Sequence, residues 1–381
     1  MSLAPRLEVR HGVTDVDATQ WDALIADDQP FLSHAFLSAL EQSGSLRCEL
    51  GWAPMPLLLY QGARLLAAAP GYLKTNSHGE FVFDHAWAQA YARYGLRYYP
   101  KLLVGVPYSP VPGPRLLIGA GADAHLRRTQ LVLAIERLVE ELRLSSAHVN
   151  FARESDAAAL AHDPWLPRCD HQYHLTRGDW RDFDDYLDAL THKKRKNLRA
   201  ERRRVTTGGL VIEWRNGTQL READLDELHA LYVQAFDRKR NTPALTRTFF
   251  SLLCERLPQR FHAAIALRNR CIVAAAIFLS SSTTLYGRYW GAREELAGMH
   301  FELCYYQGIE FLLRSGLTVF EPGAQGEHKI ARGFLPVRTR SAHLIVRSDF
   351  RRAIRAALDR EASDLRAWKR ELDRHSPFRR V

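Results

Sequence analysis

Three apolar stretches between residues 262 and 290 constrain the fold of this chain more than any other feature. Residues 262–267, 271–280 and 284–290 read as strands, and only short turns separate them. Strands that are joined so tightly pair as an antiparallel meander. A predicted helix over residues 300–314 then leads to a further strand at 317–320, and a crossover of this kind adds a parallel neighbour. The second half of the chain therefore predicts a mixed sheet flanked by helices.

The first half shows a similar order less clearly. Residues 56–60 and 64–69 read as a hairpin, a long amphipathic helix carries apolar residues from 126 to 142, and a strand follows at 147–151. With 381 residues, the chain is long enough for two domains. We predict an α/β (α+β) protein with domains at residues 1–168 and 169–381, each a mixed, mostly antiparallel sheet flanked by helices. The second domain is expected to include a basic helix at 192–204 and a C-terminal helix at 349–374.

Charge and cysteine content narrow the class of protein. The net charge of +10 favours polyanionic partners, namely nucleic acid, phosphorylated carriers or an anionic membrane surface. The five cysteines are odd in number and show no paired spacing, which argues against a disulfide framework or a zinc site. The N-terminal residues lack the apolar run of a signal peptide, and no stretch is apolar enough to span a membrane. We expect a soluble cytoplasmic protein.

The loop at residues 321–334 holds the densest set of chemically active side chains. It follows the predicted strand at 317–320, and three glycines and a proline allow its backbone to turn and to approach a ligand closely. Its side chains supply a base, hydrogen-bond donors and phosphate-binding cations: Glu321, Gln325, Glu327, His328, Lys329 and Arg332. The alternative is a solvated, charged turn.

The predicted basic helix at 192–204 carries eight lysines and arginines and one glutamate. So many cations cannot all pair within one helix, and a tRNA backbone or a lipid pyrophosphate head group would release counterions on binding there. The alternative is a solvated helix face. The residues proposed to bind the polyanion are Lys193, Lys194, Arg195, Lys196, Arg199 and Arg203.

A polar and aromatic segment in the first half forms a second candidate site. Its mixture of side chains suits a sugar or peptide acceptor, although such residues are often structural. The candidates for an acceptor pocket are Lys74, Ser77, His78, Glu80, Tyr99 and Lys101, with Asp84 and Tyr98 beside them.

Motifs along nearly the whole chain carry a resemblance to a known family. They lie at residues 30–44, 72–84, 98–101, 192–196, 201–204, 285–291, 300–308 and 322–334. With them the chain resembles the FemAB-like family of peptidoglycan biosynthesis/recognition proteins, which are GNAT-superfamily N-acyltransferases. The resemblance implies tandem GNAT-like domains and transfer of an acyl or aminoacyl group to an amine of a cell-wall precursor.

One departure from the wider GNAT pattern bears on the acyl donor. Acetyl-CoA enzymes usually carry a glycine-rich loop whose backbone N–H groups hold the pyrophosphate. Residues 291–299 occupy that position here, and they contain two glycines seven apart and adjacent carboxylates that would repel a phosphate. FemAB relatives take the acyl group from aminoacyl-tRNA, which suits the basic charge. No bound cofactor is expected, and the donor is either aminoacyl-tRNA or acyl-CoA.

Transfer to an amine requires a base, donors for the oxyanion and cations for a phosphorylated carrier. Glu327 and His328 are the first candidates for base and proton relay, and Glu302 is a third catalytic candidate whose alternative role is to favour the positive end of its helix. The remaining substrate-binding candidates in this half are Arg288, His300 and Glu321, with Gln325, Lys329 and Arg332 from the loop. No local ligand spacing supports a metal site.

The leading hypothesis is an N-acyltransferase that acts on an amine of a peptidoglycan-type precursor. The first alternative is an acetyl-CoA-dependent GNAT N-acetyltransferase of a small molecule. The second is a non-catalytic protein that binds peptidoglycan precursors or RNA, against which the adjacent Glu327 and His328 argue.

Overall fold

The chain forms two compact units in a computed structural model that describes residues 5–372 and 377–379, apart from residues 295 and 325. The first unit comprises residues 1–170 and 338–367, and the second comprises residues 171–337 and 368–381. The predicted boundary after residue 168 lies close to the first of these divisions. Assignment of all residues after 168 to the second domain was wrong, because residues 338–367 return to the first unit.

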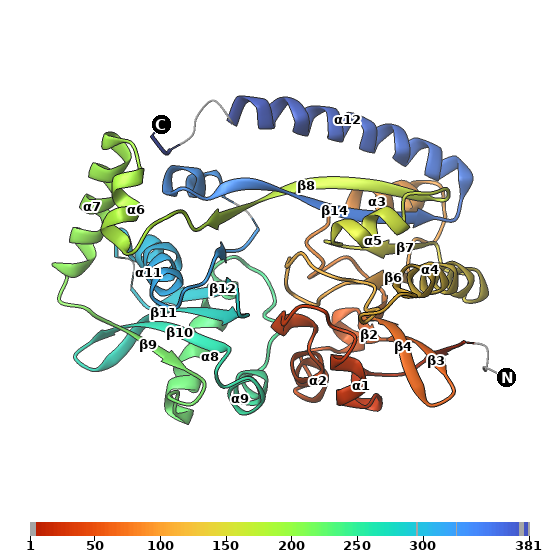
Figure 1. Ribbon diagram of the computed structural model, residues 1–381, viewed down its shortest axis with the longest axis horizontal. Coiled ribbons are helices and arrows are strands. Elements are labelled where there is room, and N and C mark those ends of the chain that lie inside the picture. Colours follow the sequence, from red (N-terminus) through yellow and green to blue (C-terminus); the bar gives the residue numbers. More distant parts are fainter. Residues whose placement is uncertain (1–4, 295, 325, 373–376, 380–381) are drawn as a thin grey trace. The chain divides into compact units, whose positions relative to one another are not determined.

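The first unit contains two sheets (Figure 1). The smaller has the order β1-β3-β4, and the larger includes the run β2-β5-β6-β7-β14. Neighbouring strands are antiparallel except for β6 and β7, which are parallel. The strands are β1 (Arg6–Val9), β2 (Trp52–Pro54), β3 (Leu57–Gln61), β4 (Arg64–Ala69), β5 (Gly71–Lys74), β6 (Lys101–Val104), β7 (Ser146–Val149) and β14 (Leu335–Ile345), the last of which begins in the second unit.

Helix α4 closes the core of the first unit. Its apolar side chains, among them Leu131, Ile135 and Leu138, pack with residues of β3, β4, β6 and β7. Helical periodicity puts them on one stripe, which removes them from water together. The helices of this unit are α1 (Ala18–Asp22), α2 (His34–Gln42), α3 (His85–Arg93), α4 (Ala124–Glu141), α5 (Glu154–Ala159) and most of α12 (Ser348–Leu372).

The second unit is built on one sheet with the order β8-β13-β12-β11-β10-β9. The predicted meander is confirmed: β10 pairs with β11 and β11 with β12, in both cases antiparallel. The predicted parallel neighbour is also confirmed, since β13 pairs in parallel with β12. The strands are the second half of β8 (Trp165–Thr176), β9 (Val211–Asn216), β10 (Phe261–Arg268), β11 (Cys271–Ser280), β12 (Thr284–Ala292) and β13 (Val319–Glu321).

Helices cover both faces of this sheet. Successive side chains of a strand point to opposite faces, and on β12 Tyr289 meets Tyr232 of α8 whereas Trp290 meets His300 at the start of the other helical layer. The mixed sheet flanked by helices, predicted twice over, is therefore present in both units. The helices are α6 (Phe183–Ala189), α7 (His192–Thr206), α8 (Glu222–Asp237), α9 (Arg247–Arg256), α10 (Met299–Phe301) and α11 (Gln307–Arg314).

Two predicted helices differ in detail. The helix expected at 300–314 is interrupted by a π-helical turn at Glu302–Tyr306, which lies between α10 and α11. Helix α12 begins at Ser348, one residue before the predicted start, and the last two residues predicted for it lie outside the described residues.

Candidate functional site

The second unit opens where β12 and β13 separate. Their ladder runs only from Thr284 to Tyr286 on β12, although β12 itself continues to Ala292. A β-bulge lies just beyond this point: Ile277 of β11 is opposite Tyr289 and Phe278 is opposite Gly287, so Arg288 has no opposite residue on β11. Bulges bend a strand and redirect its side chains, and they are common beside active sites.

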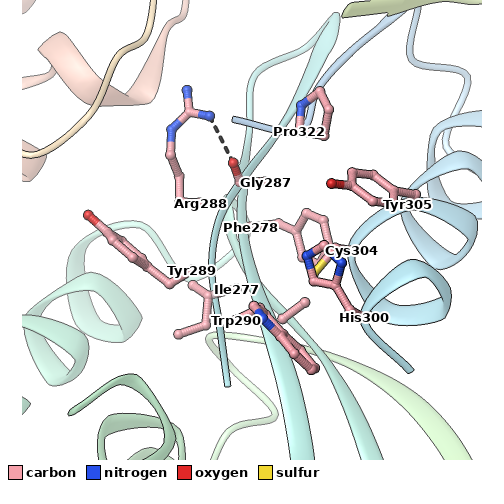
Figure 2. Close-up of a pocket in the computed structure, with 11 residues that line it drawn as sticks. Ile277, Phe278, Gly287, Arg288, Tyr289, Trp290, His300, Cys304, Tyr305 and Pro322 are labelled. Carbon is pink, nitrogen blue, oxygen red and sulfur yellow. Dashed lines mark hydrogen bonds between the residues drawn. The ribbon is translucent and has the colours of Figure 1, made fainter. Parts of the chain in front are cut away.

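A pocket of about 90 Å³ lies at this opening (Figure 2). Ligand sites usually measure roughly 300 Å³ or more, so this one has room for a small group and not for a whole substrate. Arg288 lies on β12, Pro322 directly follows β13, and His300, Cys304 and Tyr305 come from the facing helical layer (Figure 2). The remaining lining residues are Ala276, Ile277, Phe278, Gly287, Tyr289 and Trp290.

The π-helical turn explains how the helical layer reaches the pocket. A π-turn adds a residue to a helix and shifts the direction of the side chains that follow, and such turns are frequent at functional sites. Here it carries Cys304 and Tyr305, and His300 precedes it. Burial raises the pKa of the Cys304 thiol, which therefore stays protonated and is a poor nucleophile.

His328 reaches the pocket through Tyr305. Its Nε2 atom lies 2.8 Å from the phenolic oxygen of Tyr305, which lines the pocket. Burial lowers the pKa of His328 and raises that of Tyr305, so at neutral pH the imidazole is neutral and the phenol is protonated. Burial also lowers the pKa of His300 to about 4. The predicted partner Glu327 is exposed, and it makes no hydrogen bond or ion pair with any residue that the structure describes.

The loop turns two of its cations inward. Lys329 Nζ donates a hydrogen bond of 2.7 Å to the carbonyl oxygen of Gly323, and burial lowers its pKa to about 8. Arg332 donates to the hydroxyl of Tyr306 at 3.0 Å and to Glu201 at 2.7 Å, and its guanidinium lies 3.6 Å from the ring centroid of Phe301. These bonds hold the loop against its own unit, and the two cations are less available to a ligand than the sequence predicted.

Arg288 and Glu321 form the other wall of the opening. Their closest nitrogen and oxygen atoms are 3.7 Å apart, and Glu321 is 3.9 Å from the ring of His174. Burial lowers the pKa of Arg288, and burial followed by the charges of Arg288 and Lys329 lowers that of His174 to about 3. Arg288 also donates a hydrogen bond of 2.9 Å to the carbonyl oxygen of Gly287, so its guanidinium is held in place at the pocket wall. The remaining loop candidate, Gln325, lies outside the described residues.

Glu302 is buried, and its position differs from that of the other two catalytic candidates. Its two carboxylate oxygens accept hydrogen bonds from Arg202 at 2.9 and 3.1 Å. It does not line the pocket within the described part of the chain. This pairing favours a structural role for Glu302, as the link between α7 and the π-helical turn.

Helix α7 divides its charges between the protein and solvent. Arg202 turns inward, while Arg195 pairs with Asp188 and Arg199 lies 3.6 Å from Asp184. Lys193, Lys196 and Arg203 are exposed, and Lys194 is half-buried. The structure thus keeps a basic surface at the predicted position, although two of its six candidates are neutralised in part by exposed aspartates.

The candidates of the first unit form a buried cluster. Lys101 Nζ donates to Ser77 at 2.9 Å and to Glu80 at 2.8 Å, and it also pairs with Asp84. The hydroxyl of Tyr99 joins Ser77 at 2.8 Å. Lys101, Glu80 and Asp84 are almost completely buried, so these three predicted residues meet in the interior and do not line an open acceptor pocket.

Lys74 and His78 adjoin this buried cluster, and Lys74 Nζ donates a hydrogen bond of 3.2 Å to the carbonyl oxygen of His78. The ammonium of Lys74 is 3.6 Å from the ring centroid of Trp52, and its nearest contact to Glu80 measures 3.9 Å. Burial lowers the pKa of Lys74 to about 7 and raises that of Glu80 to about 7, so each is driven towards its neutral form. The side chain of His78 is exposed.

Sequence reasoning missed several members of both clusters. Tyr305 lies in the motif at residues 300–308, but the helical pattern of the sequence does not predict the π-helical turn that carries it to the pocket. His148 and His343 are separated by 195 positions, yet their Nδ1 atoms lie 2.7 Å apart in the core of the first unit. Their burial in neighbouring strands β7 and β14 could not be read from either segment alone.

Comparison with known proteins agrees with this architecture. Residues 12–380 match the FemAB-like family, described as peptidoglycan biosynthesis/recognition. The chain belongs to the FemAB-like family. No curated protein matches this member of the family.

Solved structures similar to this FemAB-like chain share its fold. FemX is 8% identical, with a TM-score of 0.53, over 91% of this chain and 100% of that one. L-PGS from Bacillus licheniformis is 13% identical, with a TM-score of 0.51, over 85% and 94% of the two chains. This likeness concerns the fold, and the predicted α/β architecture of mixed sheets flanked by helices is confirmed.

Among the described residues, no three His, Cys, Asp or Glu side chains are grouped so that they could hold a metal ion. None of the helices, over the residues described, has the length and apolar character needed to cross a bilayer.

Proposed function

We propose that this protein transfers an acyl or aminoacyl group to an amine at the pocket between β12 and β13. The observation that carries the proposal is the contact between Tyr305, which lines the pocket, and His328, which is exposed. A neutral imidazole behind a protonated phenol can draw a proton out of a small pocket, which is what attack by an amine requires.

The reaction balances with these groups alone. The neutral amine attacks the carbonyl carbon of an ester or thioester, a C–N bond forms, and the C–O or C–S bond to the carrier breaks. One amine proton passes to the oxygen of Tyr305 while the Tyr305 proton passes to Nε2 of His328. His328 returns its proton to Tyr305 as Tyr305 gives one to the leaving oxygen or sulfur of the carrier, so the products are an amide and the free carrier, and both side chains regain their starting states.

An aminoacyl-tRNA is the donor we favour. The exposed cations of α7 can contact a polyphosphate backbone, and the family description points to peptidoglycan precursors as the class of amine acceptor. Acetyl-CoA is supported less well. Residues 291–299 occupy the position of the pyrophosphate-binding loop of acetyl-CoA enzymes, and Glu294 in this segment forms an ion pair with Arg268. A carboxylate at that position disfavours a pyrophosphate.

The test uses a surrogate acceptor, so that the natural amine need not be known. Hydroxylamine attacks activated acyl groups and yields hydroxamates, which mass spectrometry detects. The purified protein is incubated with hydroxylamine and either a mixture of aminoacyl-tRNAs or acetyl-CoA, beside His328→Gln and the matched variant His125→Gln, whose imidazole is exposed on α4.

Hydroxamate formation from aminoacyl-tRNA that depends on His328 and not on His125 supports the proposal. Hydroxamate from acetyl-CoA alone supports the small-molecule N-acetyltransferase. Binding of tRNA with no turnover in either arm favours the non-catalytic alternative and overturns the proposal.

A further inference from the structure

A second opening, wholly within the first unit, carries an independent set of cations. It measures about 500 Å³, within the usual range for ligand sites. Arg97, Arg143 and Arg347 line it, together with the rings of Tyr91 and Tyr99. No aspartate or glutamate is among its lining residues in the described part of the chain.

The topology explains how three distant arginines meet. Strands β6 and β7 are parallel and adjacent. Their N-terminal ends therefore lie side by side, and so do the segments that lead into them, 94–100 and 142–145. Strand β14 is antiparallel to β7, so its C-terminal end lies beside the N-terminal end of β7, where Ile345 is opposite Ser146. Each of the three connections contributes one arginine to the groove.

The guanidinium groups of Arg97 and Arg143 are available to a ligand. Neither side chain makes a hydrogen bond or ion pair with another described residue, whereas Arg347 pairs with Asp349 at 2.6 Å. The hydroxyl of Tyr91, a residue only 1% exposed, also has no hydrogen-bond partner among the residues described.

The backbone at Arg143 gives a further reason to expect a ligand. Helices α3 and α4 end in the same way, with N–H of Leu96 donating to the carbonyl of Tyr91 and N–H of Leu144 donating to that of Val139. This ending requires a left-handed residue, which is usually glycine. Helix α3 uses Gly95 at φ 68°, but α4 uses Arg143 at φ 51°. A side chain with a Cβ is disfavoured there, and strain of this kind gathers at binding sites.

A cation near a helix C-terminus also interacts favourably with the helix dipole. That effect accounts for one arginine after α4. It does not account for the convergence of three arginines from three connections on one groove.

We propose that this groove binds a ligand with a terminal phosphate group. Guanidinium groups match phosphate in geometry and charge, and three of them line this groove. The apolar wall, with Leu142 at 47% and Val346 at 44% exposure, accepts a non-polar portion of the same ligand. This site is distinct from the pocket of the second unit and does not rest on the acyl-transfer proposal.

Arg143→Gly separates binding from folding. Glycine relieves the left-handed backbone, so we expect the melting temperature to stay the same or to rise. We expect the affinity for inorganic pyrophosphate, measured by calorimetry, to fall at least about tenfold with this variant and with Arg97→Gln, since each removes a charge-assisted contact. Arg137→Gln removes an exposed arginine of α4 that does not line the groove, and it should bind as the unchanged protein does.

Two probes identify the source of the phosphate. Binding of pyrophosphate alone indicates a soluble ligand, and Arg143-dependent flotation with phosphatidic acid vesicles, but not with phosphatidylcholine vesicles, indicates a lipid. Either result supports the site. Failure of both probes, or equal loss of binding in Arg143→Gly and Arg137→Gln, would overturn it.

Discussion

The Nε2 atom of His328 and the phenolic oxygen of Tyr305, 2.8 Å apart, join the pocket of the second unit to solvent. Tyr305 lines the pocket from a π-helical turn, whereas His328 is exposed on the loop that follows β13. Burial moves their pKa values in opposite directions, which keeps the phenol protonated and the imidazole neutral. The pair can therefore take up a proton from the pocket, and the first two predictions concern it.

Tyr305→Phe should lower the turnover number about 10²- to 10⁴-fold, the usual contribution of a positioned proton-transfer group. The apolar surface of the pocket stays in place, so KM for the donor should change little. Steady-state kinetics with the donor identified by hydroxamate formation gives both constants. Tyr94→Phe, which removes an exposed hydroxyl, is the control, and an equal loss in both variants would contradict the relay.

The pH dependence of the rate should report His328. Its pKa in the folded protein lies below the ordinary value of about 6.5, and the neutral form is the one that accepts a proton. The rate should therefore be constant near neutrality and fall as the pH drops through that lowered pKa. His328→Gln should remove this acid limb along with most of the activity, and survival of the limb in that variant would assign it to another group.

Lys101→Met should destabilise the first unit by about 3–5 kcal/mol, because it leaves the carboxylates of Asp84 and Glu80 buried without their cation. Chemical denaturation measures the loss. Replacing Asp84 with Asn in the same chain should recover part of the stability. A change below about 1 kcal/mol would mean that water reaches this cluster.

The same cluster predicts how stability varies with pH. Burial alone would raise the pKa of Asp84, but Lys101 and His148 more than offset it and hold that pKa below its ordinary value. A depressed carboxyl pKa stabilises the fold above the unfolded pKa of about 4, and this contribution is lost as the pH falls further. The free energy of unfolding should thus decline below pH 4 in the unchanged protein and decline less in Asp84→Asn.

Arg202→Gln should destabilise the second unit by about 2 kcal/mol, since Glu302 would lose the charged donor of both its oxygens. Arg204→Gln removes an exposed arginine from the same helix and should have little effect. Thermal unfolding compares the two variants. Equal stability would show that Glu302 is solvated, which would return it to the catalytic candidates.

Replacing Lys193, Lys194 and Lys196 together by Gln should weaken tRNA binding and make it less dependent on salt. Each lost phosphate contact lowers the slope of log affinity against log salt concentration by about 0.7–0.9, so three should lower it by about 2–3. A matched triple variant at Arg137, Arg352 and Arg360, exposed in the first unit, has the same net charge. Equal effects in both triples would indicate non-specific attraction.

Periodicity and turn length were sufficient to predict much of the fold. The meander of β10, β11 and β12 follows from alternation and tight turns, and the parallel strand β13 follows from the crossover. The return of residues 338–367 to the first unit was missed, because β14 is one uninterrupted strand whose two ends belong to different units. No local signal marks a unit boundary inside a regular strand.

The sequence predicted which residues gather at the candidate site better than it predicted the role of each residue. His300, Arg288 and His328 do gather at the pocket or beside it, because they lie on elements that adjoin the β12–β13 opening. Glu302 and Arg332 proved to be held by Arg202 and Glu201, partners about 100 or more positions away that sequence spacing cannot reveal. Which ion is buried with which counterion depends on tertiary packing.

The three passages of the chain between its units have a consequence for any attempt to take the protein apart. A fragment ending at residue 170 would lack β14, the hydrogen-bonding neighbour of β7, and would leave that edge of its sheet open to pairing with other molecules. A gene encoding either half as a continuous stretch cannot yield a complete unit. Separate expression of one unit would require its segments to be joined in a rearranged order.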